Sequence, residues 1–484
     1  MDPLVREYLL AMTVALAVTL LLGGPIRALA VRFGLVPAIR DRDMHKTPIP
    51  RMGGLAMFAG LAAALIVAEH FPMLERNVYH TTNTVQALLW GAFLVVVLGV
   101  VDDKYELDPL TKLAGQIFAA SVMVVKGIQI SWLVIPGMGI VAVDPTLSIV
   151  LSVFLVLLLM NAVNFVDGLD GLAAGITCIA GLASFAYCYR LAISYKLTGA
   201  TAPALIAIVT VGVCLGFLAH NWDPARLFMG DTGSMLLGML LAATSITVMG
   251  GIDPYQLGQY VQLPVNQTVT VHKLVPVYLP LIMPVSVTLL PIADMVMAVV
   301  RRTRAGMSPL AADKGHLHHR MLQIGHSKRR AVLIMYFWAA LVAFVTVLFA
   351  VTPSRQPVVY GAIAMTLVGL LMLLGPRLGD HRERLRAKAR LRRGAPAAPA
   401  RHRAQAGPGA AGPMTAPGAG PTTGPAGPAG AAPAPATANG VQIAANGVQV
   451  SAAAPGASET AVIPAIAKSP DDAEGARRPR SLSR

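Results

Sequence analysis

The chain is poor in charged residues for its length. Only 13% of its 484 residues are Asp, Glu, Lys or Arg, whereas soluble domains contain about 25%. Apolar residues make up 55%, and apolar runs of 17 or more residues recur over the first 375 positions. Each run is long enough to cross about 30 Å of hydrocarbon. These features exclude an ordinary soluble fold and indicate a multi-pass membrane protein.

Cysteine is also scarce. Cys178, Cys188 and Cys214 are the three present, in or near apolar runs and without metal-ligand spacing, which excludes a disulfide framework. The net charge of +15 does not indicate nucleic acid as a partner, because the basic residues lie between the apolar runs and in the tail. Topology and anionic lipid account for basic residues in such places. The expected partner is the lipid bilayer.

We therefore predict an all-α polytopic membrane protein with about eleven transmembrane helices and no cleaved leader. Four prolines in the ninth run predict that this helix is kinked or broken. The predicted spans are 8–30, 52–69, 85–101, 110–126, 147–163, 169–190, 201–219, 233–250, 275–300, 331–351 and 358–375.

Orientation follows from the distribution of Lys and Arg. The odd-numbered connections hold seventeen of these residues and the even-numbered ones hold six. The N-terminus is therefore expected outside, with the odd connections and the C-terminus in the cytoplasm.

Three regions are predicted along the chain. Residues 1–376 form the transmembrane domain, and 377–393 form a basic juxtamembrane segment that rests on anionic headgroups. Residues 394–484 are dominated by Ala, Pro and Gly. Such a segment buries too little apolar surface to offset its ordering entropy, so we predict a disordered tail.

Four polar clusters stand out, each in a connection assigned to the cytoplasm. They are Asp102-Asp103 with Lys104, Asp108 and Lys112; Asn161 to Gly171, with Asn164, Asp167 and Asp170; Asn221 to Ser234, with Phe228, Gly230 and Asp231; and Asp313 to Arg320, with His316, His318 and His319.

Together these clusters predict a site for a polyphosphate substrate. Several carboxylates at one membrane face suit Mg²⁺, or Mn²⁺ in its place, which takes one or two carboxylates plus substrate phosphates. Nearby Lys, Arg and His neutralise phosphate oxygens during phosphoryl transfer. A helix beginning at Asp167 would put Asp170 on the same face. Gly230 to Ser234 would open a helix whose backbone N–H groups a phosphate or metal can approach.

Each cluster alone has a structural alternative. Asp102-Asp103 fits a solvated loop that caps a helix, and Asp167 and Asp170 fit N-cap positions. The histidines fit a zinc site less well than phosphate contact, because no Cys or carboxylate has the usual spacing. Asp294, late in the ninth span, is best read as a partner for Arg301 or Arg302.

In this order, the clusters strongly resemble those of the polyprenyl-phosphate N-acetylhexosamine-1-phosphate transferases. The match covers residues 8–375 and includes the eleven-span topology, and His45 to Gly54 resembles the family's first cytoplasmic loop. The resemblance implies that a polyprenol phosphate attacks the β-phosphorus of a UDP-sugar and releases UMP. Direct attack is favoured, while a covalent intermediate on a carboxylate such as Asp103 stays open.

The resemblance also implies roles for individual residues. Asp231 would be the main Mg²⁺ ligand, and Asp102 and Asp103 would meet the metal or the lipid phosphate. The predicted catalytic residues are Asp102, Asp103, Asp231, His316, His318 and His319; the predicted metal ligands are Asp231 and Asp103; the predicted substrate-binding residues are Lys46, Asn164, Asp167, Asp170, Asn221, Phe228, Arg302 and Arg320.

Gly315 to Arg320 resembles the branch that transfers GlcNAc-1-phosphate, so UDP-GlcNAc is the expected donor and phospho-MurNAc-pentapeptide transfer the alternative. Composition is typical of a GC-rich bacterium such as an actinobacterium, in which the lipid would be decaprenyl rather than undecaprenyl phosphate. A secondary transporter is the rival from another class, but its charges would lie near the midplane. A homodimer is compatible with the sequence, which leaves the oligomeric state open.

Overall fold

Ten of the eleven predicted spans coincide with helices in the computed structural model. The structure describes residues 2–34, 49–135, 139–253, 300, 303–304, 306, 326–352 and 356–373. The long helices are α1 (Pro3–Arg32), α2 (Gly53–Ala68), α4 (Thr84–Tyr105), α5 (Pro109–Val125), α6 (Pro145–Val166), α7 (Leu172–Ser194), α8 (Thr201–Asn221), α9 (Gly230–Gly251), α13 (Lys328–Val351) and the helix Gln356–Leu373.

The membrane prediction is confirmed at the level of a multi-pass helical protein. Eight helices in the described part are long and apolar enough to cross a bilayer, or nine if a bent pair counts as one span. That pair is α2 with the short segments α3 (Pro72–Leu74) and η1 (Glu75–Tyr79), and it bends by 81°. The predicted ninth span, 275–300, lies outside the described residues apart from its last position, so the count of eleven stays a prediction.

Asp-Pro pairs determine where three of the helices begin. Asp2, Asp108 and Asp144 each precede the proline that opens α1, α5 and α6, and each carboxylate accepts a backbone N–H of the first turn. Proline suits this position because the first-turn N–H groups have no partner within the helix. Hydrogen bonds from Thr111 hold the pKa of Asp108 below its usual value. Asp108, part of the first polar cluster, therefore acts as a helix cap.

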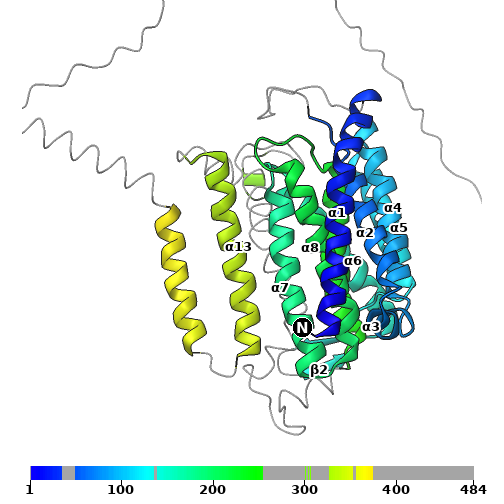
Figure 1. The fold of residues 1–484 in the computed structure, drawn as a ribbon, viewed down its shortest axis with the longest axis vertical. Coiled ribbons are helices and arrows are strands. Elements are labelled where there is room, and N and C mark those ends of the chain that lie inside the picture. Colours follow the sequence, from blue (N-terminus) through cyan, green and yellow to red (C-terminus); the bar gives the residue numbers. More distant parts are fainter. Residues whose placement is uncertain are drawn as a thin grey trace, which may run out of the picture. The chain divides into compact units, whose positions relative to one another are not determined.

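The α8 and α9 helices form the centre of the bundle. About 83% of the α8 segment and 94% of α9 is buried, compared with 6% for the helix Gln356–Leu373. α9 packs against α2, α4, α6, α7 and α8, while Figure 1 shows α1 alongside α2 and α8. A side chain on α9 is therefore positioned by several neighbouring helices at once.

A short β-hairpin is an addition to the predicted all-α fold. Strand β1 (Trp132–Ile135) pairs antiparallel with β2 (Gly139–Ala142), with Trp132 opposite Ala142. The Trp132 indole N–H donates to the Ile252 carbonyl at the end of α9, at 2.9 Å. The apolar, β-branched residues of this connection favour a strand, and each strand is too short to resemble a membrane span.

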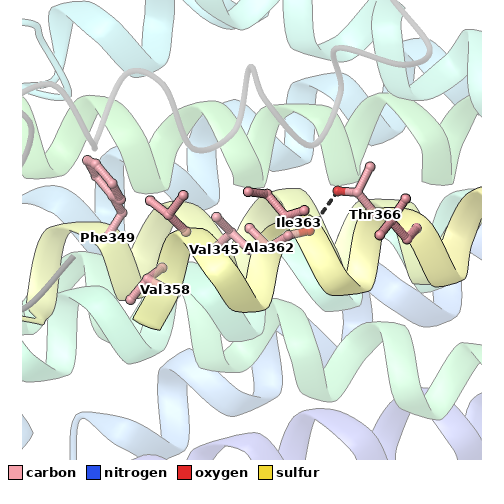
Figure 2. A pocket seen from close by; sticks show the side chains of 8 residues that line it. Val345, Phe349, Val358, Ala362, Ile363 and Thr366 are labelled. Carbon is pink, nitrogen blue, oxygen red and sulfur yellow. Dashed lines mark hydrogen bonds between the residues drawn. The ribbon is translucent and has the colours of Figure 1, made fainter. Parts of the chain in front are cut away.

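Two apolar grooves lie between α13 and the helix Gln356–Leu373. One has a volume of about 330 Å³ and is lined by Val345, Ile363 and neighbouring residues, with Thr366 as its one polar contributor (Figure 2). The Thr366 hydroxyl already donates to the Ala362 carbonyl at 2.7 Å. Because they lack charged side chains, these grooves have no part in the polar chemistry described next.

Close packing of α4 against α9 predicts a specific sensitivity at Gly99. A Cβ there would overlap the backbone of Thr232 in the first turn of α9, so Gly99→Ala should lower the thermal unfolding midpoint in detergent, at a cost of about 1–3 kcal/mol. Gly361→Ala is the matched control because a Cβ there meets open space. Equal midpoints for the two variants would contradict this packing.

Candidate active site

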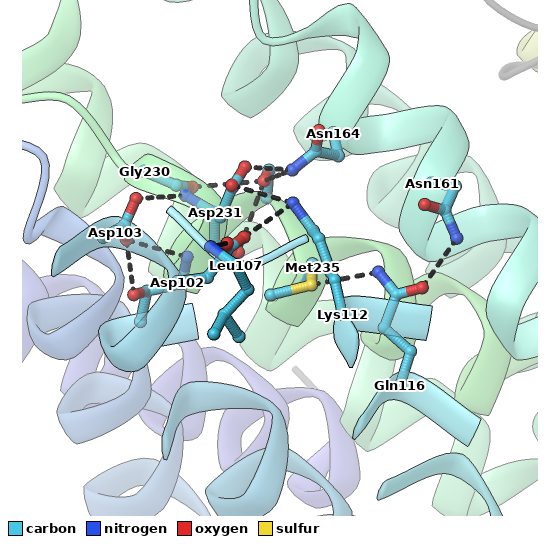
Figure 3. A network of polar contacts seen from close by, with 12 residues as sticks. Asp102, Asp103, Leu107, Lys112, Gln116, Asn161, Asn164, Gly230, Asp231 and Met235 are labelled. Atoms are coloured by element: carbon cyan, nitrogen blue, oxygen red, sulfur yellow. Dashed lines mark hydrogen bonds and ion pairs between the residues drawn. The ribbon is translucent and has the colours of Figure 1, made fainter. Parts of the chain in front are cut away.

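Three of the four polar clusters meet at one end of the bundle. The contributing elements are the last turn of α4, the first turn of α5, the end of α6 and the first turn of α9 (Figure 3). Asp102 and Asp103 lie inside α4, which continues past the predicted end of the third span at 101. The three described clusters are thus in contact with one another, while the side of the membrane on which they lie stays a prediction.

Asp231 lies at the centre of this network. It follows Gly230 in the first turn of α9, where partial positive charge from the helix N-terminus favours a carboxylate. One oxygen accepts a hydrogen bond from Lys112 Nζ at 2.8 Å, and the other accepts one from the Asn164 amide. The same amide donates to Ser234 Oγ at 2.9 Å. Side chains from α5 and α6 therefore fix the orientation of this carboxylate.

Lys112 bridges two carboxylates. Its ammonium lies 2.8 Å from an oxygen of Asp102 and 2.8 Å from an oxygen of Asp231. Asp102 is only 5% exposed, and its other oxygen accepts the Leu107 N–H at 3.0 Å. The oxygen facing Lys112 has no hydrogen bond of good geometry, so its contact with the ammonium is an ion pair. One cation thus holds together α4, α5 and α9.

Asp103 caps the N-terminus of α9 from a neighbouring helix. It accepts the backbone N–H of Asp231 at 2.9 Å, and the backbone N–H and hydroxyl of Thr232 at 3.1 and 2.7 Å. First-turn N–H groups have no partner within their own helix, so a carboxylate here stabilises the helix start. The helix that we expected to open at Gly230 does open there.

Gly230 makes this capping arrangement sterically feasible. Its φ is +69°, which a residue with a side chain rarely adopts. A Cβ at this position would overlap the Asp103 carboxylate and the Arg51 carbonyl. The glycine of the Gly-Asp-Thr-Gly-Ser motif therefore permits both the turn and the close approach of Asp103.

Asp167 lies at the end of α6, beside the network. Its carboxylate accepts no hydrogen bond from the described part of the chain, and it is half-buried. Burial, and next the negative charges of Asp231 and Asp103, raise the pKa of Asp167 to about 7, while Arg51 opposes the shift. The prediction of a helix beginning at Asp167 is wrong, as is the N-cap alternative, because α7 begins at Leu172 with Gly171 at its cap.

Asp170 and Asn221 connect the α6–α7 loop (167–171) to the α8–α9 loop (222–229). Asp170 accepts the Ala225 N–H at 3.0 Å. Asn221 accepts the Gly171 N–H at 2.9 Å and donates to the Leu227 carbonyl at 3.0 Å. Asn221 is buried, with both ends of its amide bonded to backbone. Both side chains therefore shape the loops; their predicted substrate contacts stay predictions.

Phe228 joins the α8–α9 loop to the segment before α2. Its backbone N–H donates to the Pro50 carbonyl and its carbonyl accepts the Gly53 N–H, each at 2.9 Å. This pairing brings the end of the α8–α9 loop against the residues at the start of α2. The predicted role of the Phe228 ring is not tested by these backbone contacts.

Six of the predicted site residues lie outside the described part of the chain. They are Lys46, Arg302, His316, His318, His319 and Arg320. The pairing predicted for Asp294 lies outside it as well. These assignments stay predictions.

Lys112 belongs to the first polar cluster, but the sequence alone predicted no individual role for it. Its position offered a signal: it is the one charged residue of α5, in the first turn after the Asp108-Pro109 helix start. Gln116, one turn further along, was missed entirely. It accepts the Asn161 amide at 2.9 Å and donates to Met235 Sδ at 3.1 Å. Gln116 thus ties α5 to α6 and α9 just below Lys112 (Figure 3).

The donor set fits a hard divalent cation. Asp102 and Asp231 point oxygens at one position, occupied by the Lys112 ammonium, and Mg²⁺ needs only one or two carboxylates beside substrate phosphates. Asp103 adds a third carboxylate nearby, at the backbone N–H groups that begin α9. Within the described ranges, no three acidic, His or Cys side chains converge as a complete metal cage. The site therefore fits a metal ion that takes some of its ligands from the protein and the others from a substrate.

Comparison with known proteins agrees with this geometry. Residues 85–249 match the model of Glycosyl transferase family 4, a range that contains every described site residue from Asp102 to Asp231. The chain is 43% identical over 383 residues to the decaprenyl-phosphate N-acetylglucosaminephosphotransferase of Mycolicibacterium smegmatis, covering 76% of this chain and 89% of that protein.

Two further relatives are similar to this chain over shorter lengths. A probable undecaprenyl-phosphate N-acetylglucosaminyl 1-phosphate transferase of Bacillus subtilis is 31% identical over 337 residues, covering 69% of this chain and 83% of the relative. A phospho-N-acetylmuramoyl-pentapeptide-transferase of Mycolicibacterium smegmatis is 32% identical over 275 residues, with 49% and 76% covered. The site geometry and these relatives together show that the chain belongs to Glycosyl transferase family 4.

Proposed function

We propose that this protein transfers GlcNAc-1-phosphate from UDP-GlcNAc to decaprenyl phosphate and releases UMP. The observation that carries the proposal is the Asp231 carboxylate, held at a helix N-terminus by Lys112 and Asn164 and facing Asp102 across the ammonium. Carboxylates and a lysine arranged in this way are suited to a metal-bound diphosphate. The names of the mycobacterial and Bacillus relatives supply the sugar and the lipid class.

The site is proposed to face the cytoplasm, where UDP-sugars are found. The basic residues at this end of the described helices support the orientation, since cytoplasmic connections carry an excess of Lys and Arg. Arg51 and Arg226 lie on connections beside the site and Lys104 lies in the last turn of α4. Lys328, Arg329 and Arg330 begin α13.

Asp231 and Asp102 are the residues proposed to hold Mg²⁺. When bound, the ion would neutralise phosphate charge and polarise the β-phosphorus of the donor. Asp103 is proposed to act differently, as the residue that positions Asp231, because three donors of α9 already engage its carboxylate. This assignment departs from the sequence-level hypothesis, which made Asp103 a metal ligand.

Lys112 and Asn164 are proposed to orient the reacting groups. Lys112 supplies positive charge within reach of the diphosphate, and Asn164 fixes the rotamer of Asp231. An oxygen of the lipid phosphate then bonds to the β-phosphorus as the bond to the bridging oxygen breaks, and UMP leaves with that oxygen. Direct attack is favoured over a covalent intermediate, because the carboxylate of Asp103 is committed to capping α9. A lipid phosphate is largely ionised at pH 7 and needs little help from a base.

The α6–α7 and α8–α9 loops are proposed to bind the nucleotide part of the donor. Asp170 and Asn221 join these two loops into one shaped surface beside Asp167. The surface lies close to the network around Asp231, because the negative charge of Asp231 helps to raise the pKa of Asp167 after burial itself. The uridine diphosphate would thus extend from the loops toward Asp231.

The reaction itself gives the first test. Membranes that contain the protein, Mg²⁺, polyprenyl phosphate and labelled UDP-GlcNAc should yield a lipid-extractable product and UMP. Asp231→Asn should lower the rate by about 10²–10³-fold, the loss typical of removing one group that stabilises developing charge. Asp144→Asn is the matched control, because Asn also caps a helix and Asp144 caps α6 away from the site.

Full activity in Asp231→Asn would refute the proposed site. A preference for UDP-MurNAc-pentapeptide in a panel of donors would instead assign the alternative branch, to which the second relative from Mycolicibacterium smegmatis belongs by name.

The different roles of the neighbouring aspartates give a second test. Asp102→Asn should raise the Mg²⁺ concentration needed for half-maximal rate, because it removes a proposed ligand. Asp103→Asn should leave that concentration unchanged and lower the unfolding midpoint instead, because a weakened cap costs about 1 kcal/mol. If Asp103→Asn shifts the Mg²⁺ dependence as strongly as Asp102→Asn, Asp103 is a metal ligand after all.

Asp167 gives a test that does not depend on turnover. Its pKa of about 7 means that this carboxyl is partly protonated at neutral pH in the metal-free protein. A cation at Asp231 favours the ionised form, lowers the pKa and releases a proton. Mg²⁺ should therefore bind more tightly as pH rises through 7, with proton release seen by calorimetry in buffers of different ionisation enthalpy. Asp167→Asn should abolish the release; release that persists unchanged would assign it to another group.

A further inference from the structure

The α13 helix packs against both loops of the proposed nucleotide surface. The Tyr336 hydroxyl donates to the Gly171 carbonyl in the α6–α7 loop. The Tyr336 ring contacts that of Trp222 in the α8–α9 loop, with centroids 6.3 Å apart. Its approach depends on Gly175 of α7, where a Cβ would overlap the ring. One side chain of α13 thus reaches two loops that are far apart in the sequence.

A second contact joins the start of α13 to the α8–α9 loop. Arg329 Nε donates to an oxygen of Asp223 at 3.1 Å, and Arg329 Nη2 donates to the Asp223 carbonyl at 2.7 Å. Arg329 is 57% exposed, so this ion pair contributes little to overall stability. Because it engages the backbone as well as the carboxylate, its effect is to fix where the loop lies.

These contacts complete a closed arrangement. Asn221 and Asp170 join the two loops directly, while Tyr336 and Arg329 hold each loop against the same helix. In the described part of the chain, Tyr336 and Arg329 contact the loops and not Asp231, Lys112 or Asn164. These contacts therefore affect the position of the loops and not that of the reacting groups.

We propose that Tyr336 and Arg329 are positioning residues that hold the α6–α7 and α8–α9 loops in the arrangement that binds the pyrimidine nucleotide of the donor. This inference rests on the proposed function. A ligand that spans two loops binds less tightly when either loop is free to move, because binding must then also order the loop. Tyr336 and Arg329 should therefore affect the affinity for the nucleotide and leave the chemical step and the lipid site unaffected.

Conservative variants test this with kinetics. Tyr336→Phe removes only the hydroxyl. Arg329→Gln removes the positive charge and the planar guanidinium group that donates two hydrogen bonds to Asp223. Each should raise the KM for UDP-GlcNAc by about three- to tenfold, with kcat and the KM for polyprenyl phosphate within about twofold of wild type, the pattern of lost uniform binding. Arg329→Lys, which keeps the charge but not the planar fork, should restore part of the affinity.

Matched controls separate positioning from general stability. The Tyr8 hydroxyl makes the same kind of buried bond, to the Thr201 carbonyl at 3.1 Å, but in α1 and away from both loops. Tyr8→Phe should lower the unfolding midpoint about as much as Tyr336→Phe while leaving the KM for UDP-GlcNAc unchanged. Arg330→Gln, next to Arg329, should change neither quantity.

A binding measurement removes the dependence on turnover. UMP should raise the unfolding midpoint of wild type and of Tyr8→Phe, and should raise that of Tyr336→Phe and Arg329→Gln less at the same concentration. If wild type neither turns over UDP-GlcNAc nor responds to UMP, the proposed function fails. If wild type does both and Tyr336→Phe and Arg329→Gln match their controls, the positioning role of Tyr336 and Arg329 is refuted while the proposed function stands.

Discussion

The arrangement of the active end depends on one interaction, the capping of α9 by Asp103. Among the eight described helices long enough to span a membrane, α9 has the largest buried share, and its first turn carries Asp231. A helix start buried at a membrane surface must have its free N–H groups satisfied. Asp103 does this from α4, with Gly230 providing the space. The Asp103 carboxylate of α4 therefore satisfies free N–H groups at the start of α9 and fixes the position of Asp231 on that helix.

Charge balance follows from that geometry. Asp102 and Asp231 share a single ammonium, that of Lys112, and Asp103 accepts the backbone N–H of Asp231. Like charges this close disfavour one another. Burial raises the pKa of Asp167, and the negative charges of Asp231 and Asp103 raise it further. An additional cation relieves this repulsion, which explains in electrostatic terms why the site suits a divalent metal together with a phosphate substrate. The loops proposed to bind the nucleotide are separate from the groups that carry this charge, and α13 packs against both loops.

The sequence predicted the helices well because a bilayer demands long apolar runs, and ten of these runs coincide with helices. It also predicted that three motifs meet, since their connections lie on one side by charge. It did not separate Asp102 from Asp103: adjacent carboxylates look alike in sequence, and only the approach of Thr232 distinguishes them. The place of Asp170 and Asn221 between two loops was likewise hidden, because their partners are backbone groups. Backbone partners leave no trace in residue type.

The central claim is that Asp231 is where a metal-bound diphosphate meets the lipid phosphate. A cryo-electron microscopy map of the protein with Mg²⁺ and UDP-GlcNAc tests it most directly. The account predicts metal density beside Asp231 and Asp102, the diphosphate next to Lys112, and the nucleotide along the loops 167–171 and 222–229. Metal density bound to Asp103 with α9 uncapped, or a nucleotide bound away from these loops, would contradict it.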